Sequence, residues 1–340
     1  MWRRRFIQEI CLGEINNFIA IINMNATAEK VLRFLLAPFI HVRRRYWKYL
    51  MYNHPQKWAD ELYRLSFGRG INWDNPKDMN EKQRWIQFKT DTSEWTRLAD
   101  KYAVRDYIKS KGLSEILVDL YGVWYDADQI DFTQLPNSFV MKTNHGCGEV
   151  MLVKDKSAIN ENEVRTKFRD YLNTPYGYQA AEYHYLHIKP CIIAEELLED
   201  RTGLSTSLID YKFYVFHGEP HACAVFFNRV LGTHNVAYGL YDMNWNCIEN
   251  TSSHIVDPEG VFLPKPHTLD KMIDACKILA AQFPFVRLDF YEVNGQLYFG
   301  EFTFTPSGLN SGSNVYTKER MDKWGDLMDL SIFPNYKVKH

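Results

Sequence analysis

Two apolar runs near the C-terminal end of the chain contain acidic, hydroxyl and guanidinium side chains. Asp289 and Glu301 lie where a plain core hairpin would have another Val or Leu. Residues two apart in a strand share a face, so Arg287 aligns with Asp289, and Glu301 with Thr303. Carboxylate and hydroxyl oxygens suit Mg²⁺, which completes its shell with water and phosphate oxygens, and an arginine beside them would bind a phosphate.

The two runs flank Asn294-Gly295, which predicts a β-hairpin because Asn and Gly tolerate the positive φ of tight turns. A two-residue loop would pair Val293 with Gln296 and send Glu301 to the face opposite Asp289. A three-residue loop with a bulge at Gly295 would place both carboxylates on one face. A magnesium site therefore requires an odd-length loop, and the alternative is a sheet whose polar side is solvated.

A second candidate site is LPNSFVMKTNHGCGEVMLVKD, where Lys142 ends an apolar strand and a glycine-rich loop follows. Glycine lets backbone N–H groups approach phosphate oxygens, and lysine supplies a point charge. The order differs from G-x-x-x-x-G-K-[ST], since the lysine precedes the glycines and a strand follows. A glycine-rich hairpin turn is the commoner meaning of such a segment. Cys147 in the loop has no ordered Cys/His/Asp pattern to make it a nucleophile.

Four weaker signals remain open. The strand KPCIIAEELLED ends either as a plain strand or as a hinge that reads an adenine edge. His184 and His187 form an H-x-x-H pair without an apparent third zinc ligand. The Tyr- and His-rich residues 174–190 suit either a sugar acceptor pocket or an ordinary interface. Asp126-Ala127-Asp128 resembles the D-x-D of a glycosyltransferase but lacks a donor-site pattern.

The elements that must position these residues follow from the hydrophobic spacing. With 340 residues, 46% of them hydrophobic, the chain can bury a large core. Residues 55–111 have helical spacing, with Asn80 expected to cap one helix and residues 98–112 expected to form another. From Leu113 short strands dominate, with helices expected at about 161–173 and 269–283. Mixed strands, hairpins and helices predict an α+β fold with antiparallel sheets.

Charge and cysteine content limit the function classes. The net charge of −2 gives no global bias toward nucleic acid or acidic lipid. Six cysteines without a C-x-x-C pair suit a reducing cytosol. Glu9 and Glu14 interrupt the apolar stretch that a cleaved signal needs. The basic and aromatic segment from Lys30 to Leu50 is too short to span a membrane. It suits either the interface of an anionic membrane or packing on the domain.

Five segments together resemble the TupA-like branch of the ATP-grasp superfamily. They are ADKYAVRDYI, LPNSFVMKTNHGCG, EYHYLHIKPCIIAEELLED, DYKFYVFHGEP and FVRLDFYEVNGQLYFGEFTFTP. The resemblance covers residues 67–328 with the motifs in the expected order, which is more specific than any single motif. ATP-grasp enzymes hold ATP between two α+β lobes and phosphorylate a carboxylate, after which an amine or similar nucleophile attacks the acyl phosphate. The branch is named for teichuronopeptide synthesis, and its members act in bacterial surface-polysaccharide pathways.

The resemblance implies roles for individual residues. Lys101 matches the lysine that meets the α-phosphate, and Lys142 the strand lysine that bridges the α- and β-phosphates. Arg287 matches the arginine beside the transferred phosphoryl group, and Lys212 is expected at the γ-phosphate. The resemblance implies a phosphate lid made of Asn144, His145, Gly146, Cys147 and Gly148. It implies an adenine hinge at Glu195, Glu196 and Leu198. The implied magnesium ligands are Asp289, Glu301 and Thr303. The superfamily usually has Asn where Thr303 stands, so this is a variant site.

The expected enzyme is an ATP- and Mg²⁺-dependent carboxylate–amine ligase that joins an amine or amino acid to a uronic-acid glycan. It is expected in the cytoplasm, with membrane contact through Lys30 to Leu50. The expected domains are a helical segment (1–52), a mainly α subdomain (53–134), a small lobe with the phosphate lid (135–194) and a large lobe with the magnesium site (195–340). A nucleotide-sugar glycosyltransferase and a noncatalytic membrane or polysaccharide scaffold are the alternatives.

Overall fold

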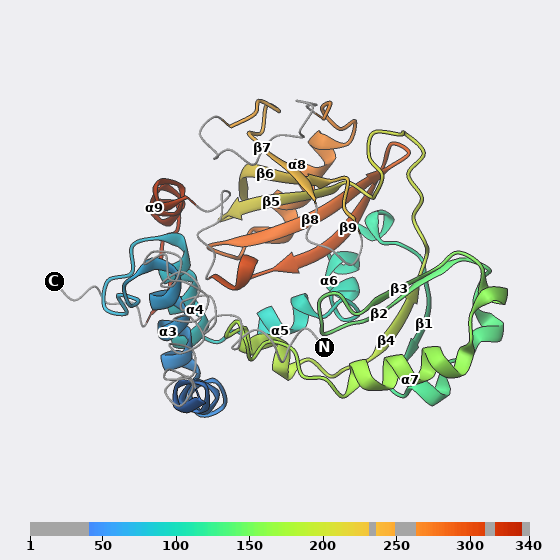
Figure 1. Ribbon diagram of the computed structural model, residues 1–340. Helices are drawn as coiled ribbons and strands as arrows, with labels where there is room; N and C mark the ends of the chain where they lie inside the picture. Colours follow the sequence, from blue (N-terminus) through green and yellow to red (C-terminus); the bar gives the residue numbers. More distant parts are fainter. Residues whose placement is uncertain (1–40, 231–235, 249–262, 310–316, 335–340) are drawn as a thin grey trace, which may run out of the picture.

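Two antiparallel sheets form the framework of the computed structural model, which describes residues 41–230, 236–248, 263–309 and 317–334. Figure 1 shows the larger sheet above the smaller one, with a group of helices beside them. The four-stranded sheet has the order β1-β4-β2-β3, and the five-stranded sheet the order β7-β6-β5-β8-β9. The expected α+β fold with antiparallel sheets is confirmed.

The smaller sheet is built from short strands, with α7 (Glu161–Leu172) packed against β2. Its strands are β1 (Leu120–Trp124), β2 (Phe139–Thr143), β3 (Val150–Val153) and β4 (Ile192–Glu195). Phe139 and Met141 of β2 point into a core that also contains Phe168 of α7. Alternation along β2 leaves Lys142 on the half-buried face, directed away from that core.

The larger sheet buries one face and keeps charged residues on the other. Its strands are β5 (Asp210–Phe216), β6 (Glu219–Phe227), β7 (Ala237–Tyr241), β8 (Val286–Val293) and β9 (Gln296–Thr303). Phe213 pairs with Cys223 and Leu288, and these buried side chains share the face covered by α8 (Leu269–Ala280). Lys212 and Asp289 therefore lie on the opposite face. The sequence did not indicate β7.

A helical layer precedes the sheets. Residues 41–53 are helical, followed by α3 (Pro55–Phe67) and α4 (Met79–Lys89). Trp47 and Leu50 of the first helix pack with Trp58 of α3, so packing on the domain is confirmed for the described part of the Lys30–Leu50 segment. Residues 30–40 lie outside the described residues. The shorter elements are α9 (Lys318–Asp326) and 3₁₀ turns at Ser114–Ile116, Ala127–Gln129, Phe132–Gln134, Lys156–Ala158, Tyr183–His187 and Pro306–Leu309.

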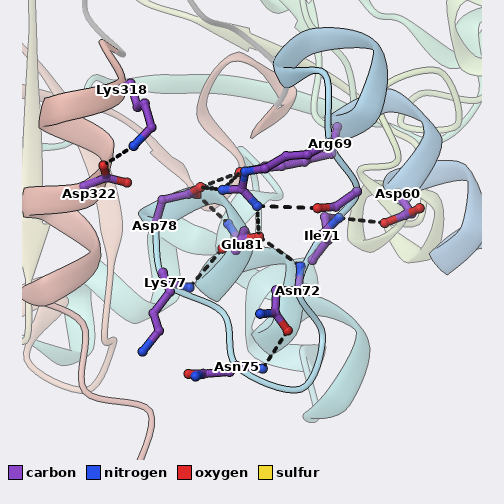
Figure 2. A network of polar contacts seen from close by, with 12 residues as sticks. Asp60, Arg69, Ile71, Asn72, Asn75, Lys77, Asp78, Glu81, Lys318 and Asp322 are labelled. Atoms are coloured by element: carbon purple, nitrogen blue, oxygen red, sulfur yellow. Dashed lines mark hydrogen bonds and ion pairs between the residues drawn. The ribbon is translucent and has the colours of Figure 1, made fainter.

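A charged network fixes the turn-rich segment between α3 and α4. Arg69 lies between Asp78 and Glu81, at 2.8 and 2.5 Å, as Figure 2 shows. The side chain of Asp78 accepts the Glu81 backbone N–H at 2.9 Å and is the N-cap of α4. The prediction of Asn80 as the cap is wrong by two residues, since Asn80 is already inside the helix.

The helix expected over residues 98–112 is broken into α5 (Ser93–Ala99) and α6 (Val104–Ser110). Asp100 causes the break, because its side chain accepts the backbone N–H groups of Tyr102 and Ala103 at 2.8 and 3.2 Å. Lys101 therefore lies in a turn and not in a helix. Its backbone N–H donates to the carbonyl of Asn144 at 3.2 Å, which brings it to the glycine-rich loop.

Candidate active site

The β8–β9 hairpin brings the two carboxylates together by a route that the sequence analysis did not anticipate. Asn294 and Gly295 form a two-residue turn at φ 52° and 79°, and Val293 pairs with Gln296. The two-residue loop is therefore the one present, and the inference that a shared face requires an odd-length loop is wrong. The register shifts farther along, between Asp289 and Phe290 opposite Gly300, and beyond that bulge Asp289 pairs directly with Glu301. One extra residue in β9 restores the shared face.

Glycine is required at position 300 of this bulge because there is no room for a Cβ atom. A Cβ atom there would lie 2.9 Å from the carbonyl oxygen of Asp289 and 3.2 Å from Cε2 of Tyr291. The first neighbour is backbone, so it cannot rotate away. The signal was present in the sequence, because an isolated glycine inside a strand often marks a bulge or a close backbone approach.

Two cations hold the buried carboxylate of Asp289. Lys212 Nζ on β5 lies 2.5 Å from Oδ2, and Arg287 binds both oxygens through Nε and Nη2 at 2.7 and 2.8 Å. Asp289 is only 1% exposed. Burial pushes its pKa upward, but Arg287 and Lys212 outweigh burial, so the pKa lies below its ordinary value. The carboxylate is therefore ionised at neutral pH.

Arg287 also contacts two side chains of the neighbouring strand β9. Arg287 Nη2 lies 3.2 Å from Glu301 Oε1 and 3.0 Å from Thr303 Oγ1, and the Thr303 hydroxyl donates to Glu301 at 3.0 Å. Glu301 keeps a side-chain exposure of 37%, compared with 2% for Asp289. The five predicted residues Lys212, Arg287, Asp289, Glu301 and Thr303 thus form one contiguous polar row on one sheet face.

This row fits a magnesium ion that is completed by other oxygens. The described residues contain no group of three or more His, Cys, Asp or Glu side chains that could hold a metal by themselves. A nucleotide-site Mg²⁺ needs only one or two carboxylates, because water and phosphate supply the rest. Ionised Asp289 and half-exposed Glu301 would provide these two oxygen donors. Metal roles for them and for Thr303 remain predictions.

Across the molecule, Lys142 on β2 belongs to a second buried ion cluster. Its Nζ lies 2.5 Å from Glu195 Oε2 on β4, while Arg105 Nη1 of α6 lies 3.2 Å from Oε1. Arg105 also donates to the carbonyl of Val118 at 2.7 Å. The side chain of Glu195 therefore orients two cations, a role that the sequence analysis did not assign. Arg105 was missed because nothing in its local sequence marks it.

The glycine-rich loop is anchored at its start. Asn144 donates from Nδ2 to Asp100 and to the Lys189 carbonyl, at 2.9 and 3.0 Å, and its Oδ1 accepts the Cys191 N–H at 2.7 Å. Its side chain therefore holds the loop in place instead of facing a ligand. Lys101 Nζ donates to the Gly146 carbonyl at 2.7 Å. The buried His145 ring lies 3.3 Å from the Thr174 carbonyl oxygen.

Cys147 links the loop to the charged row. Cys147 is exposed, yet desolvation by the surrounding protein and the charge of Glu301 raise the pKa of its thiol, whereas Lys101 and Arg287 lower it, so these groups lie within electrostatic reach of one another. The net shift is upward, and the thiol is protonated at neutral pH. This state does not favour a nucleophilic cysteine. Gly148, at φ 78°, is the left-handed residue that turns the loop toward β3.

The other candidate residues have local structural contacts. Glu196 donates its backbone N–H to the Asp119 carbonyl at 3.0 Å, and Leu198 is half-buried in the segment that follows β4. Asp126 caps a 3₁₀ turn and Asp128 pairs with Arg169 at 2.5 Å, so the D-x-D residues have separate structural contacts.

One family model and several solved structures are similar to this chain. No curated protein matches the sequence. Among solved structures, D-alanine–D-alanine ligase from Bacillus anthracis aligns with 15% identity and a TM-score of 0.40, covering 74% of this chain and 69% of that one. The ATP-grasp ligase PsnB complexed with its minimal precursor aligns with 13% identity and a TM-score of 0.37, covering 75% and 69%. A family model described as TupA-like ATPgrasp matches residues 81–328, well over half of the 340 residues. The chain therefore belongs to the TupA-like ATP-grasp family.

Proposed function

We propose that the protein is a carboxylate–amine ligase that uses ATP to form an acyl phosphate and then an amide. The proposed acid is a uronic acid of a bacterial surface polysaccharide, and the proposed nucleophile is an amine or amino acid. The observation that carries this proposal is the row of Lys212, Asp289, Arg287 and Glu301, in which cations and carboxylates alternate on one sheet face.

In this proposal the smaller sheet binds the nucleotide. Lys142 and Lys101 contact its phosphates, and the loop from Asn144 to Gly148, including His145, Gly146 and Cys147, covers them. Asn144 contributes by anchoring that loop, since its own polar atoms are already bound. Residues 195–198, including Glu195, Glu196 and Leu198, form the adenine hinge. Glu195 acts there by orienting Lys142.

The larger sheet would carry out the phosphoryl transfer. Arg287 and Lys212 stabilise negative charge on the transferred group, which is the main requirement of such a transition state. Asp289 holds both cations in place. Asp289, Glu301 and Thr303 would hold Mg²⁺, which when bound neutralises phosphate charge. Because the row is assembled before substrate arrives, little reorganisation is needed during the reaction.

The function is tested by incubating the full-length protein with Mg²⁺, ATP and either glucuronic or galacturonic acid, with hydroxylamine to trap an acyl phosphate. We expect ADP release that depends on the acid, together with hydroxamate formation. Arg287→Lys is a suitable variant, because lysine keeps the charge but cannot bind Asp289 through two donors. ATP-independent turnover of a nucleotide sugar would instead favour the glycosyltransferase alternative, and absence of Mg·ATP binding would favour the scaffold.

We also propose peripheral membrane contact through the helix of residues 41–53. Tyr46, Tyr49 and Tyr52 are 53%, 52% and 48% exposed, on the side opposite buried Trp47 and Leu50. Arg45 lies four residues before Tyr49 and so adjoins this tyrosine face, as expected for contact with anionic headgroups, whereas the Arg43 guanidinium lies over the buried Trp47 ring at 4.3 Å. In the part of the chain that the structure describes, no helix is long and apolar enough to cross a bilayer. Sedimentation with phosphatidylglycerol vesicles, compared for the wild type and Tyr49→Ser, tests this contact.

A further inference from the structure

The two ends of the β8–β9 hairpin face different parts of the molecule. At the turn, Asn294 Nδ2 donates to the Glu199 carbonyl at 3.2 Å, next to the segment that follows β4. At the other end, two residues beyond Thr303, Thr305 Oγ1 donates to Glu182 Oε1 at 2.7 Å. The proposed hinge and Glu182 therefore lie at opposite ends of β9, with Glu301 and Thr303 between them.

This order along the strand assigns a direction to the reaction. In phosphoryl transfer the attacking and leaving oxygens are roughly in line with the phosphorus. If adenine occupies the hinge, ADP leaves toward the turn and the acid attacks from the Thr305 end. The nucleophile that later displaces phosphate from the acyl group must also approach there. Glu182 is the buried carboxyl that the structure describes at that end.

The backbone around Glu182 is held in a fixed conformation by its contacts. Its N–H donates to the Gly177 carbonyl at 2.7 Å, and a Cβ on Gly177 would lie 2.4 Å from the Glu182 carbonyl oxygen. Ala181 has φ 55°, which costs a residue with a side chain some strain. Buried Arg84 donates to the carbonyls of Ala181 and Gly308 at 2.6 and 2.5 Å, and so ties this segment to the turn at Pro306–Leu309 that follows β9.

The surroundings of Glu182 are aromatic and mixed in charge. Tyr176 and Tyr185 pack edge to face at 4.9 Å, and the charge of Glu182 contributes to the raised pKa of both phenols. Burial raises the pKa of Glu182 to about 7, although Thr305, Arg84 and Tyr176 lower it, and Glu301 adds to the rise. The carboxyl is thus poised to hold or release a proton near neutral pH.

We propose that Glu182, held by Thr305 and Tyr176, receives the amine substrate as its ammonium ion and takes a proton from it. The Glu182 carboxylate accepts one proton, which leaves a neutral amine. The nitrogen lone pair then attacks the acyl carbon, a C–N bond forms, and the C–O bond to phosphate breaks with its electrons leaving on phosphate. The departing phosphate takes the second proton that the nitrogen loses as the amide forms. This assignment rests on the proposed function and narrows the nucleophile to an amine that is protonated at neutral pH.

Hydroxylamine separates this step from acid activation, because it is largely unprotonated at neutral pH and needs no base. With the acid that gives hydroxamate, the second assay replaces hydroxylamine by ethanolamine or by amino acids and measures amide by mass. We expect Glu182→Gln to lower the rate of amide formation by roughly a hundredfold or more at pH 7, and to spare hydroxamate formation. The difference in amide-formation rate between Glu182→Gln and the wild type should become smaller as rising pH deprotonates the free amine.

Two further variants control for folding. Tyr176→Phe should lower amide formation, whereas Tyr183→Phe should not, since the Tyr183 hydroxyl donates to the Met51 carbonyl at 2.6 Å in the helical layer. Equal loss of amide and hydroxamate in a folded Glu182→Gln protein would show a structural role and overturn the inference. Unchanged amide formation would overturn it as well. Absence of hydroxamate in the wild type would refute carboxylate activation itself, and therefore the proposed function.

Discussion

The bulge at Gly300 makes a specific prediction, because the whole alignment of Asp289 with Glu301 depends on it. In Gly300→Ala the new methyl group would lie 2.9 Å from the Asp289 carbonyl oxygen and 3.2 Å from its carbon. Overpacking of this kind costs about 1–3 kcal/mol when the surroundings must shift. Here the shift falls on the backbone of β8 at Asp289 itself. A displacement near 1 Å at a reacting centre lowers activity by about a hundredfold.

Urea denaturation and acid-dependent ADP release measure the two consequences separately. The matched control is Gly295→Asn in the same hairpin, where a Cβ atom would have no neighbour within 4 Å and φ is +79°, a conformation that Asn tolerates. We expect the control to retain most of its stability and turnover, and Gly300→Ala to lose both. A Gly300→Ala protein as stable and active as the control would refute the role of the bulge.

Three further predictions concern buried ionisable groups. Arg105→Met should lower the free energy of unfolding by about 2 kcal/mol in urea denaturation, since it removes one of two cations on Glu195. Glu182 has a raised pKa of about 7, so wild-type stability relative to Glu182→Gln should fall by about 1 kcal/mol per pH unit between pH 4.5 and 7; a flat difference contradicts this. Burial lowers the pKa of His184 to about 3, so wild-type stability relative to His184→Gln should fall as the pH drops from 6.5 toward 3.

Local patterns in the sequence predicted the elements of the site better than their register. The Asn294-Gly295 turn was correctly placed, because Asn and Gly are residue types that readily adopt a positive φ. The shared face of the carboxylates depended on a bulge five residues beyond the turn, and strand alternation alone gives no position for such an insertion. The outcome, a shared face, was the condition set for a magnesium site.

Residues that act through long-range contacts were the ones missed. Arg105 reaches Glu195, 90 positions away, and Thr305 reaches Glu182, 123 positions away. Each is ordinary in its own segment, so only the folded chain reveals the pairing. The broken helix at Asp100 has the opposite origin. Its cause is local, since an Asp side chain competes for backbone N–H groups, and the helical spacing concealed it.

The contacts of Asp289 also change how the site should be tested. Asp289 is buried between Lys212 and Arg287, and removing it would leave two cations without their shared carboxylate, at a cost of about 3–5 kcal/mol. Glu301 is partly exposed and can be replaced with less damage. Glu301→Gln is therefore the cleaner variant.

The Mg²⁺ dependence of ATP affinity, measured by calorimetry for the wild type and Glu301→Gln, tests the proposed magnesium site most directly. This measurement needs neither acid nor amine. We expect Mg²⁺ to strengthen ATP binding by the wild type, and folded Glu301→Gln to lose at least about tenfold of this gain in affinity, or roughly 1.4 kcal/mol. An unchanged gain in the variant would contradict a magnesium site on the β8–β9 hairpin.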